Sequence, residues 1–107
     1  MQVVATAGPA SGAVQLRVRG ELDIATAPQL AAELERVLAA HPRLVVLELG
    51  ELSFLDCAGM RPLRHALSDL RCRGGSLVIR HAPPLAERAL HLAGLGDALD
   101  RGGVPLG

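Results

Sequence analysis

The chain has 107 residues, of which 11 are basic and 11 acidic, and half of all residues are hydrophobic. That length suits a single domain over residues 1–107, with a core large enough to fold without a metal ion or a disulfide. The balanced charge argues against direct nucleic-acid binding, because no surplus of positive charge exists to displace phosphate counterions. Every basic residue is arginine, and the absence of lysine excludes Schiff-base chemistry and a Walker-type phosphate loop.

Cysteine usage and hydropathy predict a reduced, cytoplasmic protein without membrane insertion. Cys57 and Cys72 are too few for a disulfide framework and too far apart for a Cys-x-x-Cys motif. The N-terminus lacks the charged and apolar regions of a signal peptide. The strongest apolar run, residues 44–47, is broken at Glu48, far short of the length that a membrane span needs.

The first residues of the chain predict a β-hairpin. Residues 14–18 alternate apolar and polar side chains, which is the pattern of a half-exposed strand. The stretch 8–12 contains glycine and proline and predicts the turn that pairs this strand with residues 3–5.

A helix is predicted to begin at Thr26. Thr26 and Gln29 have the spacing of a capping box, and Pro28 fits the first turn, where its missing N–H costs nothing. Four apolar residues recur at helical spacing and are predicted to face the core: Leu30, Leu34, Val37 and Leu38. The His-Pro dipeptide at 41–42 ends the helix.

The second half of the chain continues with a strand and a helix. Residues 43–49 have a continuous apolar centre, which is typical of a strand covered on both faces. The apolar face of the following helix is formed by Leu63, Leu67 and Leu70. Asp69 and Arg73 on this helix are spaced for an exposed ion pair, and Gly74 stops it.

A short strand at residues 76–80 and a third helix follow. Prolines at 83–84 open that helix, and its inward residues are predicted to be Leu85, Ala89 and Leu92. The tail, residues 101–107, is predicted to add a short edge strand or to fray. The alternation of strands and helices implies right-handed crossovers, so the predicted fold class is α/β. We expect a mixed, mostly parallel sheet of four to five strands with helices packed against it, their leucine and alanine faces forming the core.

The most informative segment, residues 52–60, lies between the buried strand and the second helix. Functional loops of open α/β sheets follow the carboxyl ends of strands, and a helix start there leaves N–H groups free. Pro62 is tolerated only near the first turn, so we predict that the helix begins near Ala58 and that position 58 is its N-cap. Alanine at an N-cap costs about 1 kcal/mol relative to serine, which makes this residue unexpected.

Two segments carry a family resemblance: Gly-Glu-Leu-Asp-Ile-Ala-Thr-Ala-Pro at 20–28 and Leu-Ser-Phe-Leu-Asp-Cys-Ala-Gly-Met at 52–60. Together they resemble the STAS domain and, more narrowly, the bacterial anti-sigma factor antagonists. The second segment is similar to the family motif Asp-Ser-Ser-Gly or Asp-Ser-Thr-Gly followed by an apolar residue. The resemblance covers essentially the whole chain, in segment order and spacing, and implies a STAS-like fold.

The resemblance implies partner switching rather than catalysis. Such a protein binds an anti-sigma factor that is also a serine kinase, and so frees the sigma factor to join RNA polymerase. The kinase phosphorylates the hydroxyl residue just before the motif glycine, and that position is Ala58 here; the motif serine before it is Cys57. We therefore expect a non-phosphorylatable antagonist with no catalytic residue, no metal and no cofactor.

The expected partner-binding site combines both segments. It consists of Asp23, Thr26, Asp56, Cys57, Ala58, Gly59, Met60 and Arg61. Simpler roles stay open for several of these residues. Asp56 could act only as a carboxylate that the helix dipole stabilises at the start of the second helix. Asp23 and Thr26 could act only in stabilising the loop and the cap of the first helix. For Cys57, a small space-filling role is favoured over redox sensing, because the neighbouring carboxylate opposes a lowered thiol pKa.

Two other functional classes compete with this interpretation. A receiver domain using Asp56 as phosphoacceptor would need an acidic cluster for Mg²⁺ and a later lysine, and the chain has no lysine. A structural STAS subunit of a larger assembly, such as a lipid-transport or signalling complex, is slightly favoured by the missing phosphosite. The sequence leaves open the partner's identity and whether the protein forms a homodimer.

Overall fold

The computed structural model describes residues 1–100, so the predicted tail at 101–107 lies outside the described residues. In chain order the elements are β1 (Gln2–Ala7), β2 (Ala13–Leu22), α1 (Ala27–Leu38), β3 (Leu44–Leu55), α2 (Arg61–Cys72), β4 (Ser76–Arg80), α3 (Pro84–Leu92) and a 3₁₀ turn, η1 (Gly96–Ala98).

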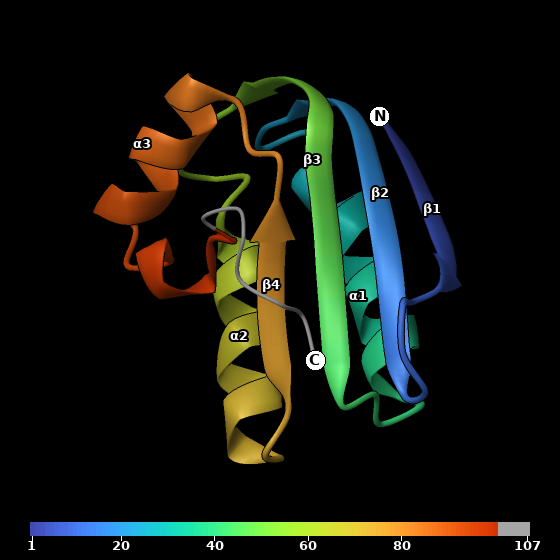
Figure 1. Cartoon of the computed structure of the whole chain (residues 1–107). Helices are drawn as coiled ribbons and strands as arrows, with labels where there is room; N and C mark the ends of the chain where they lie inside the picture. Colours follow the sequence, from blue (N-terminus) through green and yellow to red (C-terminus); the bar gives the residue numbers. More distant parts are fainter. Residues whose placement is uncertain (101–107) are drawn as a thin grey trace.

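The strands form one mixed sheet in the order β1-β2-β3-β4 (Figure 1). β1 pairs antiparallel with β2, which confirms the predicted hairpin, while β2–β3 and β3–β4 are parallel pairs. A helix connects the strands of each parallel pair, because the chain must return to the same end of the sheet before the next strand begins. The predicted α/β class with a mixed, mostly parallel sheet is therefore confirmed.

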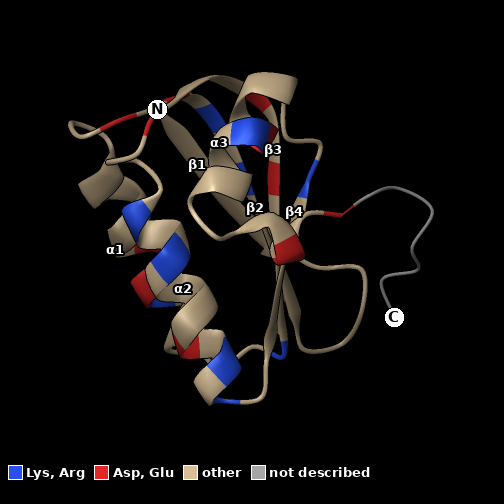
Figure 2. Ribbon diagram, turned by 90° about the vertical axis from the view of Figure 1, so that its left-hand side faces the viewer, with Lys and Arg blue, Asp and Glu red and all other residues tan. Residues whose placement is uncertain are grey.

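Helices α1 and α2 lie side by side on one face of the sheet, and α3 contacts β3 near one end (Figures 1 and 2). The core between these layers is hydrophobic, and no polar or charged residue among residues 1–100 is buried. The predicted inward leucines and valine of α1 are all buried, as are the three leucines of α2. In β3, three consecutive residues are buried, which confirms a strand centre covered on both faces: Val45, Val46 and Leu47.

β3 runs longer than the sequence predicts. It continues past the expected end at Leu49, through Gly50, to Leu55. Two register shifts of β2 against β3, between residues 17 and 21, keep the strands paired over this more polar stretch. As a result both strands end together, with Leu22 paired to Leu55.

The C-terminal end of α2 matches its prediction. Gly74 has a φ of +78°, in the left-handed region that favours glycine after a helix. The N–H of Gly75 donates to the carbonyl of Leu70 at 2.7 Å. The predicted ion pair between Asp69 and Arg73 is present, with 3.3 Å between nitrogen and oxygen.

The predicted inward face of α3 is wrong for its two leucines, whereas the third predicted residue, Ala89, is half-buried and packs against the core. Leu85 and Leu92 are 85% and 84% exposed, and the buried residues of this helix are Ala86 and Leu90. Both pairs are apolar and helically spaced, so periodicity could not distinguish the two faces. Leu90 is the residue that joins α3 to the common core.

We expect Leu90→Ala and Leu92→Ala to differ sharply in stability. Removing the buried side chain of Leu90 leaves a cavity and lowers the free energy of unfolding by about 2–5 kcal/mol. The same change at exposed Leu92 alters that free energy by less than about 0.5 kcal/mol. Urea titrations followed by circular dichroism measure both values, and equal losses would contradict the assigned face.

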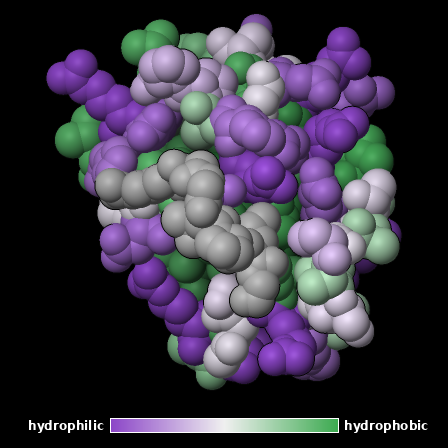
Figure 3. Space-filling view, viewed as in Figure 1, coloured by the Kyte–Doolittle hydropathy of each residue, from purple (hydrophilic) through white to green (hydrophobic). Residues whose placement is uncertain are grey.

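The face of the molecule seen in Figure 3 intersperses hydrophilic and hydrophobic residues. Hydrophobic atoms reach it in separate places, so its coloured part offers no single broad apolar docking area. None of the helices between residues 1 and 100 is both long enough and apolar enough to cross a membrane.

Candidate functional site

The two segments singled out by the sequence meet at one edge of the sheet. They follow β2 and β3, whose last residues, Leu22 and Leu55, are paired in parallel. The link continues beyond the strands, since the N–H of Asp56 donates to the carbonyl of Leu22 at 3.2 Å. The structure thus brings the loop at Asp23 and the turn at 56–60 together.

The loop between β2 and α1 is held by its own polar side chains. Oδ1 of Asp23 accepts the N–H groups of Ala25 and Thr26, each at 3.0 Å. Oγ1 of Thr26 donates to the carbonyl of Glu21 at 2.8 Å and accepts the N–H of Asp23 at 2.9 Å. The simpler role left open for Asp23 and Thr26, loop stabilisation, accounts for these bonds.

The predicted capping box of α1 is wrong. Thr26 occupies the N-cap position and Pro28 the first turn, but Thr26 makes no side-chain cap bond. Its backbone has α-helical angles, φ −99° and ψ −17°, instead of the extended conformation that aims an N-cap side chain at the helix. The amide of Gln29 donates to the carbonyl of Met1 at 3.0 Å instead of reaching back to the cap.

The predicted N-cap of α2 is also wrong. The helix begins at Arg61, with Met60 as the N-cap residue and Pro62 in the first turn. A turn precedes it, in which Oδ1 of Asp56 accepts the N–H of Gly59 at 2.9 Å. Ala58 lies inside this turn and not at the N-cap, so alanine at this position does not weaken the capping of α2.

Gly59 makes the closest approach in the site. An added Cβ at this buried residue would lie 2.4 Å from the carbonyl oxygen of Leu22 and 2.8 Å from its carbonyl carbon. Real side chains do not tolerate such distances to backbone atoms, so only glycine fits without a shift. The glycine therefore sets how closely the turn packs against the end of β2.

Exposure separates the predicted binding residues at 56–61 into three groups. Cys57 and Arg61 are exposed, whereas Asp56 and Ala58 are half-buried. Exposure also excludes the space-filling role for Cys57. Met60 is 2% exposed and belongs to the core, and Gly59 is buried where the turn packs against the end of β2, so these two residues support the surface from below.

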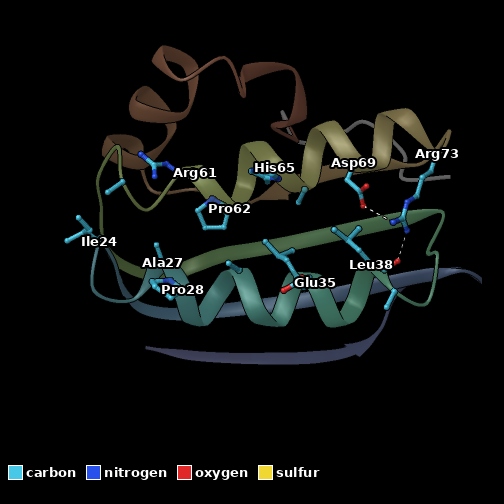
Figure 4. A pocket seen from close by; sticks show the side chains of 15 residues that line it. Ile24, Ala27, Pro28, Glu35, Leu38, Arg61, Pro62, His65, Asp69 and Arg73 are labelled. Atoms are coloured by element: carbon cyan, nitrogen blue, oxygen red, sulfur yellow. Dashed lines mark hydrogen bonds and ion pairs between the residues drawn. The ribbon is translucent and has the colours of Figure 1, made fainter.

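Sequence reasoning missed a groove of about 850 Å³ between α1 and α2, which begins beside the turn (Figure 4). Ala58 and Arg61 line it at this end, and Ile24, which is 77% exposed, forms its lip. The spacing of Ala27 and Ala31, one helical turn apart on α1, was the available signal. Neither alanine is among the core residues predicted for this helix, and both line the groove.

Similarity to known proteins agrees with this architecture. A model of the STAS domain family matches residues 6–102, which is most of the chain. The chain belongs to the STAS domain family. The resemblance drawn from the segments at 20–28 and 52–60 is therefore confirmed.

Two sequence relatives of this STAS domain carry the name of anti-sigma factor antagonist. BtrV of Bordetella bronchiseptica, provisionally named so, is 32% identical over 77 residues, which cover 72% of this chain and 66% of BtrV, just under two thirds. The anti-sigma-B factor antagonist of Listeria monocytogenes is 28% identical over 87 residues, 81% of this chain and 76% of that protein.

Solved structures show the same STAS fold. SpoIIAA in its unphosphorylated form has a TM-score of 0.79 at 19% identity, with 92% of this chain and 86% of that chain covered. An anti-sigma factor antagonist from Mycobacterium paratuberculosis has a TM-score of 0.76 at 28% identity, with 95% and 88% covered.

Proposed function

We propose that this STAS domain is an anti-sigma factor antagonist, which binds a serine-kinase-type anti-sigma factor and thereby releases a sigma factor for transcription. One observation carries the proposal: the Asp23 loop and the turn at 56–60 form a single surface, held by the close approach of Gly59 to Leu22. The names of the sequence relatives support the same assignment. The proposed role is regulatory and takes place in the cytoplasm.

The exposed part of this surface supplies the proposed contacts. Asp56 uses Oδ1 for the N–H of Gly59, which leaves its second carboxylate oxygen for a partner. The guanidinium of Arg61 makes no ion pair within residues 1–100 and can receive a carboxylate in two parallel bonds. Cys57 and Ala58 lie between these charges in sequence and complete the contact set.

The same surface lacks the group on which phosphorylation would act. SpoIIAA has been solved in both an unphosphorylated and a phosphorylated form. Ala58 has no hydroxyl, and the exposed thiol of Cys57 is not the usual acceptor of a serine kinase. We therefore propose an antagonist that stays in its binding state, with its effect set by abundance or by a different switch.

We expect Arg61→Glu and Asp56→Asn each to weaken binding to the cognate anti-sigma factor by about tenfold or more, because the first reverses and the second removes a charge in the proposed contact. Asn at 56 keeps an acceptor for the N–H of Gly59, so the turn should persist. Calorimetric titration against each serine-kinase-type anti-sigma factor of the source genome measures the affinities. Arg64→Glu is the matched control, since Arg64 is an exposed α2 arginine outside the groove lining.

Two outcomes would contradict the proposal. Undiminished binding by both variants would move the contact away from this surface. Failure of the wild-type protein to bind any such anti-sigma factor, together with co-purification of membrane transporter subunits from native lysate, would favour the structural-subunit alternative. That alternative also fits a domain with alanine at position 58.

A further inference from the structure

The α1–α2 groove has two unlike walls (Figure 4). The wall on α1 is small and mostly apolar, with Ala27, Ala31 and Ala39 along one ridge. The wall on α2 is a ridge of charged or polar side chains spaced by four residues: Arg61, His65, Asp69 and Arg73. Buried apolar side chains from both helices line the space between these ridges, including Leu34, Leu38, Pro62 and Ala66.

One end of the groove is tied and the other is open. At the tied end, Nη1 of Arg73 donates to the carbonyl of Leu38 at 2.7 Å, and Nη2 pairs with Asp69 at 3.3 Å (Figure 4). At the other end, beside the turn, Ile24 and Arg61 extend from opposite sides (Figure 4). The groove is therefore continuous with the surface proposed to bind the anti-sigma factor.

The charges in the groove are only partly compensated. Asp69 and Arg73 neutralise each other, but the side chains of Arg61 and Glu35 make no ion pair within the described part of the chain. Arg61 stands at the open end, and Glu35 lies on α1 farther along (Figure 4). An occupant that satisfies both needs an acidic group at the open end and a basic group farther in.

The dimensions suit a helix. The lining residues on the α1 side run from Ala27 to Ala39, which at 1.5 Å per residue is about 18 Å, or about three turns of helix. An amphipathic helix of that length would place one apolar stripe on the alanine wall and keep polar residues toward solvent. The exposed side chain of Ile24 extends the apolar lining of the groove to its entrance.

We infer that the α1–α2 groove receives an amphipathic helix of the protein partner, with an acidic residue against Arg61 and a basic residue against Glu35. This inference rests on the proposed function for the partner's identity, but the groove can be tested separately. It extends the contact from the turn at 56–60 along most of the length of α1 and α2.

Filling the groove tests the inference. Ala31 and Ala32 are adjacent exposed residues of α1, but only Ala31 lines the groove. We expect Ala31→Trp to weaken binding of the anti-sigma factor by about tenfold or more, and Ala32→Trp to bind as the wild type does. Matching thermal unfolding curves show that both variants fold. Wild-type affinity in Ala31→Trp would overturn the inference and leave the proposed function standing.

A synthetic peptide separates the two hypotheses. The probe is an amphipathic 14-residue peptide, about four turns of helix, with a leucine stripe and glutamate at one end. Nuclear magnetic resonance should show shifts confined to the groove residues, lost in Ala31→Trp, and weaker with lysine in place of glutamate. If the peptide binds there while no anti-sigma factor binds, the proposed function fails and the groove remains a helix site.

Two results of the peptide experiment would overturn the inference. One is the absence of shifts in α1 and α2 at millimolar peptide. The other is self-association in analytical ultracentrifugation that Ala31→Trp abolishes, because the groove would then be occupied by a second copy of the chain.

Discussion

Gly59→Ala is expected to lower the free energy of unfolding by about 3 kcal/mol, at the upper end of the usual cost of overpacking a buried site. The added methyl carbon would lie 2.4 Å from the carbonyl oxygen of Leu22, so the turn and the end of β2 must move apart. For a domain of this size, that loss lowers the midpoint of thermal unfolding by on the order of 10 °C. Differential scanning calorimetry measures the shift.

The same substitution should also weaken partner binding. Moving the turn away from Leu22 displaces Asp56 and Arg61 relative to the Asp23 loop, and the proposed surface depends on both segments. Gly50→Ala is the control: Gly50 is exposed in β3, and a Cβ there would meet the side chains of Glu48 and His81 at an ordinary 3.4 Å. If both variants melt within about 2 °C of the wild type, where surface substitutions usually fall, the close approach is not what holds the two segments together.

This juxtaposition was predictable from the sequence. Strand-like and helix-like segments alternate after residue 13, and such alternation produces parallel neighbours whose carboxyl ends share one edge. The Asp23 loop and the turn at 56–60 each follow one of those strands, so their meeting follows from topology alone. No side-chain detail was needed for that step.

The start of α2 was not predictable in the same way. Starts near Ala58 and at Arg61 both keep Pro62 close to the first turn, so proline chemistry does not choose between them. The carboxylate of Asp56 favours the start at Arg61, because it accepts the N–H of Gly59 and stabilises a separate turn before the helix. That bond depends on where β3 ends, and β3 runs farther than its apolar centre indicates.

The groove and the orientation of α3 depend on where the helices pack. The spacing of apolar residues in the sequence gives no information on that placement. Ala31 is apolar and follows buried Leu30 on α1, yet it is exposed and lines the groove. Leu92, a larger apolar side chain at helical spacing, is also exposed. Leu92 was assigned to the core although the element that it packs against was unknown.

Wild-type protein incubated with its cognate serine-kinase-type anti-sigma factor and ATP is expected to gain no phosphate, whereas Ala58→Ser gains one. The reason is chemical, since position 58 carries no hydroxyl while the turn around it retains Asp56 and Gly59. Intact mass spectrometry distinguishes the two products. A stoichiometric phosphate on the wild-type chain would contradict the proposal of a permanently binding antagonist.

Two other hydroxyls near the site could then be the acceptor, and peptide mapping would tell them apart. Oγ1 of Thr26 is engaged with the carbonyl of Glu21 and the N–H of Asp23, so its modification would require the loop to open. Ser53 is exposed in β3 beside Phe54, which is itself half exposed. Ser53 is therefore the more accessible of the two.

Phosphorylated Ala58→Ser is expected to lose at least tenfold in affinity for the anti-sigma factor, while the unmodified variant binds as the wild type does. A phosphate adds close to two negative charges in the middle of the contact surface, next to the carboxylate of Asp56. Serine at 58 should not stabilise α2, because Met60 is its N-cap, so the unmodified variant melts with the wild type. Affinities measured before and after phosphatase treatment test this, and equal affinity in both states would show that position 58 no longer controls binding.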